Sequence, residues 1–192
     1  EGVTIPTAMD GFCRLSDDYG KLGLDAILQP AIRYAEEGVP VAPRVAFDWN
    51  LLQGDLQGTA RDRYLIDGKV PVAGQMFRSP EQAEVLRRIA MDGRDGFYEG
   101  EVAEDMVASL NAFGGVHTLD DFSGCLAEYT DPVSGGYGGL DLWEHPPNGQ
   151  GATAILMLNI LKHFELAGME PFGAQRAHIE AEAAKLAYDT RN

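Results

Sequence analysis

The most constraining feature of the sequence is a run, residues 152–164, that is apolar on nearly every side of a helix. A helix without a polar face has to lie in a core, with neighbours on most sides. Each large aliphatic side chain buried there stabilises the fold by about 1.5–3 kcal/mol, and a face left uncovered would drive association. The run therefore predicts a buried helix, and we expect part of its cover to come from outside these 192 residues.

Helical signals dominate the sequence before this run. Apolar residues recur at helical spacing from Leu24 to Ala35, and Pro30 within that stretch predicts either a kink or a second helix that begins there. Ser79 precedes a proline at another helix start, where we expect its side chain to act as the cap and Gln82 to complete a capping box. Thr118 is expected to cap a short helical turn.

After Gly124 the pattern changes to strands. Residues 126–133 and 140–144 are predicted to form two strands, joined through a glycine-rich connection at 134–139. Phosphate-binding glycine loops are followed by a helix, whereas these glycines are followed by a strand. The connection is therefore interpreted as part of a hairpin.

These elements predict the α+β class, mainly helical in this stretch. We expect a mostly helical part, residues 1–124, and a strand pair followed by two helices, residues 125–192, within a single partial domain that covers residues 1–192. The formal net charge of −15 repels phosphate backbones and anionic lipids. No nucleic-acid partner and no membrane partner are therefore expected.

The usual metal and nucleophile motifs do not occur in the sequence. Cys13 and Cys125 match no zinc or redox spacing, and two free buried thiols are the expected state. The four histidines are scattered, and neither HExxH nor G-x-S-x-G is present. We expect no metal site and no cofactor.

One segment between the second strand and the apolar helix stands out: residues 145–151, His-Pro-Pro-Asn-Gly-Gln-Gly. Its glycines let the backbone turn sharply, and amides at a helix N-terminus favour a carboxylate or an oxyanion. The candidates for a substrate pocket are Asn148, Gly149, Gln150 and Gly151. The alternative is a rigid strand-to-helix turn capped by Asn148, and the residues alone favour this alternative over the pocket.

Several short blocks along almost the whole chain share one property, which is their order. They are 19–20 with 29–38, 96–100, 114–115 with 118–122, 132–138 with 143, 146–151, and 180–188. Each block is weak alone, and the ordered combination is specific. Similar blocks follow one another in the same order in the γ-glutamyltranspeptidase family, and the sequence therefore resembles that family.

The resemblance implies an N-terminal-nucleophile hydrolase, with an αββα sandwich completed by segments outside this chain. It implies cleavage of γ-glutamyl amides, as in glutathione, through an acyl-enzyme on a threonine of the smaller subunit of the same self-cleaved precursor. In the family the nucleophile lies downstream of this stretch, and the arginine that holds the γ-glutamyl carboxylate lies upstream. We therefore expect no catalytic residue in this chain, which would be inactive alone.

Two segments depart from the family pattern. Residues 6–11 replace Pro-Gly-Thr-Val-Ala-Gly, and residues 145–151 replace Pro-Pro-Pro-Ser-Ser-Gly-Gly. The second form is similar to that of a bacterial side branch, which leaves transfer or hydrolysis open. A catalytically silent, mostly helical binding module is the alternative from another class. The expected partners are the smaller subunit and a γ-glutamyl small molecule, with a homo-oligomer as a further option, in the bacterial cytoplasm or periplasm.

Overall fold

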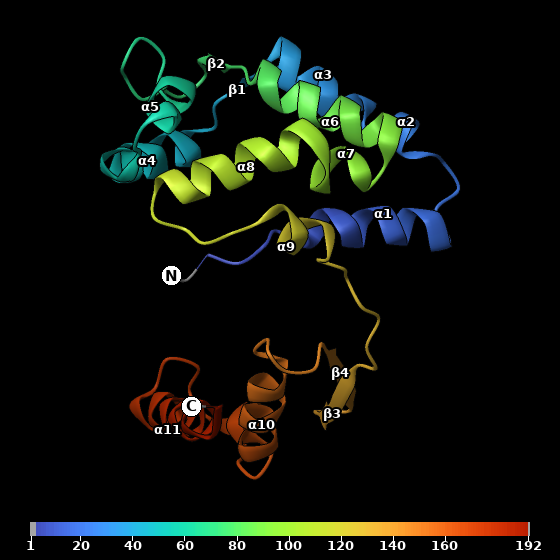
Figure 1. Ribbon diagram of the computed structural model, residues 1–192. Helices are drawn as coiled ribbons and strands as arrows, with labels where there is room; N and C mark the ends of the chain where they lie inside the picture. Colours follow the sequence, from blue (N-terminus) through green and yellow to red (C-terminus); the bar gives the residue numbers. More distant parts are fainter. Residues whose placement is uncertain (1–2, 192) are drawn as a thin grey trace. The chain divides into compact units, whose positions relative to one another are not determined.

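The computed structural model describes residues 3–191 and divides the chain into two compact units, Glu1–Ala127 and Glu128–Asn192 (Figure 1). The elements of the first unit are α1 Ala8–Tyr19, α2 Leu24–Ile27, α3 Gln29–Glu37, β1 Val39–Pro40, α4 Pro43–Leu52, η1 Gln53–Asp55, α5 Thr59–Tyr64, β2 Met76–Phe77, α6 Pro80–Asp92, α7 Asp95–Tyr98, α8 Gly100–Ala112 and α9 Leu119–Ser123. Those of the second are β3 Val133–Tyr137, β4 Leu140–Glu144, α10 Gly151–Leu161, η2 Leu166–Gly168 and α11 Ala174–Arg191. The prediction of a mainly helical α+β chain is confirmed. Within residues 3–191, no helix has the length and apolar character needed to span a membrane.

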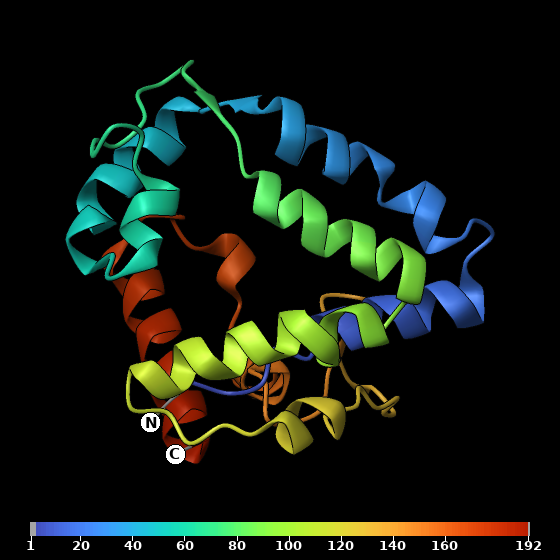
Figure 2. The same cartoon turned by 45° about the horizontal axis from the view of Figure 1, so that its top comes forward.

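In the first unit, α3 and α6 lie side by side, as both ribbon views show (Figures 1 and 2). The Ser79 N–H at the start of α6 donates to the Ala35 carbonyl oxygen over 2.8 Å. Arg78 Nε donates to the carbonyl oxygen of Glu37 over 2.9 Å, and the short antiparallel pair β1–β2 continues the contact. These hydrogen bonds and the strand pair fix the start of α6 against the end of α3.

The three helix starts that the sequence singles out have different outcomes. Pro30 lies in the first turn of α3, so a second helix forms in place of a kink. Thr118 caps α9 as predicted, because its hydroxyl accepts from the Asp121 N–H while the Asp121 carboxylate accepts from the Thr118 N–H, a capping box. The cap predicted for Ser79, with Gln82, is wrong. No side chain caps α6, and Ser79 takes part only through its backbone, which donates to Ala35 of α3 and accepts from the Ala83 N–H of α6.

A buried ion pair, which we call the Asp10–Arg94 cluster, joins α1 to the end of the first unit. Asp10 is buried, and its carboxylate accepts from Arg94 Nε at 2.7 Å and from the Ala127 N–H at 2.6 Å. Arg94 also donates to two carbonyl oxygens of residues 123–125, at 2.6 and 3.0 Å. Its guanidinium carbon lies 4.7 Å from the centre of the buried Tyr98 ring. The donors of Arg94 are therefore used within its own unit.

The first predicted strand is placed wrongly, because residues 126–132 are irregular. Side chains of α1 hold Ala127: Arg14 Nη1 donates to its carbonyl oxygen over 2.6 Å, and the Asp10 carboxylate accepts from its N–H. Backbone groups held by side chains in this way form no strand ladder. The strand starts only at Val133.

The second unit opens with the hairpin β3–β4. Val133 pairs with Glu144 and Tyr137 with Leu140, so the predicted glycine connection is mostly strand and the turn is only Gly138 and Gly139. Both turn glycines have positive φ, 59° and 82°, as two-residue hairpin turns require. The hairpin is confirmed, and its first strand is shifted along the sequence.

The apolar run forms α10, which packs on both strands of the hairpin and on α11. A Cβ atom at Gly135 of β3 would lie 2.6 Å from Ile155 Cγ2, so a glycine is needed for this approach. The centre of the unit's core is buried Leu161, Leu166 and Ala183. The helix is confirmed, and residues 154–160 are only half-buried within this unit, since the hairpin and α11 leave part of its surface uncovered.

Candidate functional site

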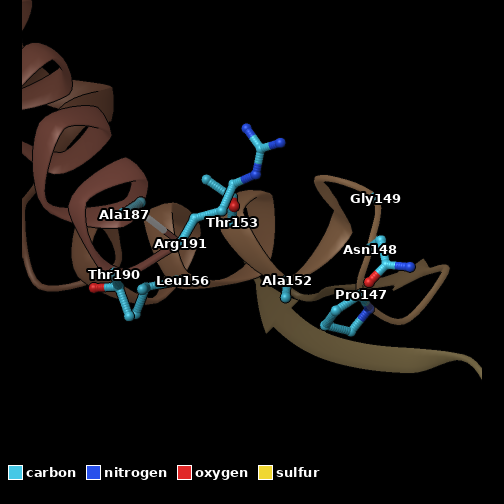
Figure 3. A pocket seen from close by; sticks show the side chains of 9 residues that line it. All are labelled: Pro147, Asn148, Gly149, Ala152, Thr153, Leu156, Ala187, Thr190 and Arg191. Atoms are coloured by element: carbon cyan, nitrogen blue, oxygen red, sulfur yellow. The ribbon is translucent and has the colours of Figure 1, made fainter. Parts of the chain in front are cut away.

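The segment that the sequence singles out as a candidate pocket borders a cavity in the second unit. The cavity has a volume of about 370 Å³ and lies between the turn before α10, the first turns of α10 and the end of α11 (Figure 3). The lining residues come from these three places and are Pro147, Asn148, Gly149, Ala152, Thr153, Leu156, Ala187, Thr190 and Arg191. The turn and the C-terminal end of α11 therefore share one hollow.

The four predicted pocket residues divide into two pairs. Asn148 and Gly149 line the cavity. Gln150 and Gly151 lie beside it and shape the turn: Gln150 Oε1 accepts a hydrogen bond from the Tyr188 hydroxyl over 2.8 Å, which links the turn to α11. The first turn of α10 has no side-chain cap, so Asn148 does not cap the helix as the rigid-turn alternative supposes.

The two glycines of the turn have different surroundings. A Cβ atom at Gly149 would meet no atom within 4 Å, and its φ lies outside the positive region that favours glycine. A Cβ atom at Gly151 would clash with the side chain of Glu144 and lie 2.7 Å from the His145 carbonyl oxygen. Gly151 is therefore required for packing of α10 against the end of β4, whereas Gly149 has space around it.

Sequence reasoning missed three polar side chains of the cavity, Thr153, Thr190 and Arg191. Thr153, in the first turn of α10, is only 8% exposed and lines the cavity. Arg191 forms no ion pair with any residue that the structure describes. A hydroxyl in the first turn of an otherwise apolar helix was a signal for Thr153. Nothing local in the sequence marked Arg191, because α11 brings it to the cavity from 40 residues further along the chain.

The lining of the cavity offers hydrogen-bond donors. Backbone N–H groups of the first turn, a hydroxyl, an amide and a guanidinium can donate hydrogen bonds, and the lining offers no thiol or carboxylate to act as nucleophile or base. Both cysteines are free and lie in the first unit. Burial raises the pKa of the Cys13 thiol, which lowers its reactivity. Within residues 3–191, no three histidine, cysteine or acidic side chains form a group that could hold a metal.

Known proteins resemble the chain along its whole length. The chain is 34% identical to a glutathione hydrolase-like proenzyme of Bacillus subtilis, over 99% of the chain and 37% of that protein. A glutathione hydrolase proenzyme of Escherichia coli is 30% identical, with 97% of the chain and 33% of the proenzyme covered. The chain thus spans about a third of the length of these relatives.

Solved structures share the fold. The γ-glutamyltranspeptidase of Helicobacter pylori superposes with a TM-score of 0.89 at 26% identity, over 95% of this chain and 54% of that one. A cephalosporin acylase of Bacillus halodurans superposes with a TM-score of 0.86 at 36% identity, over 97% of this chain and 36% of that one. The family model described as gamma-glutamyltranspeptidase matches residues 1–192. The chain therefore belongs to the γ-glutamyltranspeptidase family, a family of enzymes.

Proposed function

We propose that the whole protein cleaves γ-glutamyl amides and that this chain is part of its larger subunit. The observation that carries the proposal is the family match over residues 1–192, together with the structural likeness to a γ-glutamyltranspeptidase. The reaction is attack by a threonine hydroxyl on the γ-glutamyl carbonyl, with the threonine's own amine taking the proton. The amine product leaves, and water or another amine then releases the glutamyl group from the ester.

The threonine belongs to a smaller subunit cut from the same precursor. The names of the curated relatives support this partner, because they are proenzymes. The half-buried surface of α10 also supports it, since a helix that is apolar on nearly every side needs more cover than the second unit provides. We propose that the smaller subunit provides that cover and completes an αββα sandwich.

The turn at Asn148–Gly151 would line a pocket of the complete enzyme. Asn148 and Gly149 lie on the cavity, while Gln150 and Gly151 hold the turn in shape. Asn148→Ala should lower kcat/KM for a γ-glutamyl amide with little change in melting temperature. Unchanged kinetics in this variant would remove the turn from the pocket and leave the rest of the proposal in place.

The reaction itself is tested with the full-length, processed protein and a chromogenic γ-glutamyl anilide, with and without a dipeptide acceptor. Release of the anilide is expected from the two-subunit protein and not from residues 1–192 alone. Stimulation by the dipeptide would indicate transfer, and its absence hydrolysis. A processed protein that releases no anilide would contradict the proposal.

A second candidate is cleavage of a cephalosporin side-chain amide by the same threonine chemistry. The cephalosporin acylase is more similar in sequence to this chain, at 36% identity, than the γ-glutamyltranspeptidase of H. pylori, at 26%. The two candidates differ in the acyl group and share the nucleophile. Parallel assays with the γ-glutamyl anilide and a cephalosporin amide would separate them by the ratio of the two kcat/KM values.

A further inference from the structure

We propose that Asn148 is a site of spontaneous deamidation. The backbone nitrogen of Gly149 closes a succinimide ring on the Asn148 side chain, and water opens the ring to isoaspartate and aspartate. The modification needs only these two residues and water. It therefore goes beyond the γ-glutamyl reaction and does not depend on it.

The reaction balances without an oxidant, a reductant or a further reactant. The Gly149 nitrogen gives its proton to solvent base and attacks Asn148 Cγ, so that an N–Cγ bond forms. The Cγ–Nδ2 bond breaks, and the side-chain nitrogen takes up a proton and leaves as ammonia. Water then adds to one of the two ring carbonyls. Breaking the new N–Cγ bond gives aspartate, whereas breaking the original peptide bond gives isoaspartate.

The surroundings of Gly149 favour ring closure. The backbone N–H of Gly149 donates no hydrogen bond to any residue within 3–191, so the attacking nitrogen is not held elsewhere. A Cβ atom at this position would meet no atom within 4 Å, which leaves the backbone room to move. A residue without a Cβ atom also reaches the ring conformation more readily than any other. The turn before α10, on which both residues lie, is exposed (Figure 3).

The other asparagines within residues 3–191 lack these conditions. Asn50, Asn111 and Asn159 lie in α4, α8 and α10, where intrahelical hydrogen bonds fix the backbone. Each of their side chains takes part in a hydrogen bond, at 2.9, 3.1 and 2.8 Å. Each is followed by a residue with a side chain. The Asn148 side chain has no hydrogen bond with the described residues, so Asn148 alone in this part of the chain combines a free amide with a following glycine.

The modification would change the cavity. Among the described residues of the lining, Arg191 is the one that carries a charge, so a carboxylate at position 148 would cancel the formal charge of the lining. Isoaspartate would also lengthen the main chain by one methylene group just before α10. The modified protein should therefore separate from the unmodified one as a more acidic form.

The test follows position 148 by mass spectrometry of peptides from full-length protein stored at neutral and at mildly alkaline pH. A methyltransferase that labels only isoaspartate tells the two products apart. Both products are expected at position 148, sooner at alkaline pH because the attacking nitrogen must lose its proton. The rate should be about tenfold or more above that at Asn50, Asn111 or Asn159, since a helix must open before its backbone can close a ring.

Two glycine variants separate the succinimide route from other routes. Gly149→Ala should slow the reaction about tenfold or more, because a Cβ atom restricts the backbone. Gly168→Ala is the matched control, since Gly168 lies in the same unit with free space and no positive φ, and it should leave the rate at Asn148 unchanged. Melting temperatures establish that each variant folds.

Protein unfolded in denaturant sets the time of the experiment. An Asn148 that stays unmodified in the folded protein while the unfolded protein is converted would overturn the proposal. Formation of aspartate without isoaspartate, or a rate that Gly149→Ala leaves unchanged, would overturn it as well.

Discussion

Arg94 in the first unit and Arg191 in the second have the same five N–H donors and different surroundings. Arg94 meets the Asp10 carboxylate, two carbonyl oxygens and the Tyr98 ring, and only 21% of its side chain is exposed. Arg191 lines a cavity without an ion pair among the described residues. An arginine whose donors are used within its own unit stabilises the fold, whereas one with unused donors beside a cavity is available to a ligand.

The largest expected effect follows from removing the carboxylate of the Asp10–Arg94 cluster. Asp10→Ala removes the buried counter-charge of Arg94, leaves only the exposed Asp95 at 3.7 Å, and frees the Ala127 N–H, so the free energy of unfolding should fall by about 3 kcal/mol. Arg191→Gln should change it by less than about 0.5 kcal/mol. Urea unfolding measures both, and equal losses would break the comparison between the two arginines.

The two glycines of the turn before α10, Gly149 and Gly151, should also differ in how much stability their substitution costs. Gly151→Ala forces a methyl group against Glu144 and the His145 carbonyl, and should cost about 1–3 kcal/mol. Gly149→Ala has free space and no positive φ, so its cost should stay within about 0.5 kcal/mol. Thermal unfolding of the two variants side by side gives the order. A larger loss for Gly149→Ala would show that the turn differs from the structure described.

Two threonines give a further contrast, because only one of them caps a helix. Thr118→Val removes the cap of α9 and should cost about 1 kcal/mol. Thr153→Val removes a hydroxyl that caps no helix and should change stability by less than about 0.5 kcal/mol. A larger loss of stability in Thr153→Val would indicate that the hydroxyl has a partner within the protein.

The smallest effect is a pH dependence at the same cap. Hydrogen bonds from the Thr118 hydroxyl and N–H hold the pKa of Asp121 below its usual value. A lowered carboxylate pKa contributes stability that is present above the unfolded value, near pH 4, and is lost as the pH falls through the folded value. Asp121→Asn should therefore lose less stability than the unaltered protein in this acid range. Identical acid profiles from chemical unfolding would contradict this role of the cap.

Local signals in the sequence predicted the local structure well. Pro30 and Thr118 marked helix starts correctly, because fixed φ and a capping box act within a few residues. Ser79 failed because its helix start is tied to the Ala35 carbonyl, a contact made across the fold. The strand predicted from residue 126 failed at Ala127 for the same reason, since side chains of α1 hold both backbone groups of that residue.

The candidate site was predicted in part. Glycines and prolines located the turn, and Asn148 and Gly149 do line a cavity. Arg191 comes from the far end of α11, and only the packing of α10 on α11 brings it to the turn. Pairings of this kind depend on tertiary packing, which short sequence patterns do not encode.

The most direct test of the central claim, that this chain is part of a self-cleaving γ-glutamyl enzyme, is mass spectrometry of the full-length protein after brief exposure to a γ-glutamyl anilide. We expect two polypeptides, with residues 1–192 in the larger one and a glutamyl group on the N-terminal threonine of the smaller. An intact single chain, or a cleaved protein that carries no glutamyl adduct and releases no anilide, would contradict the claim.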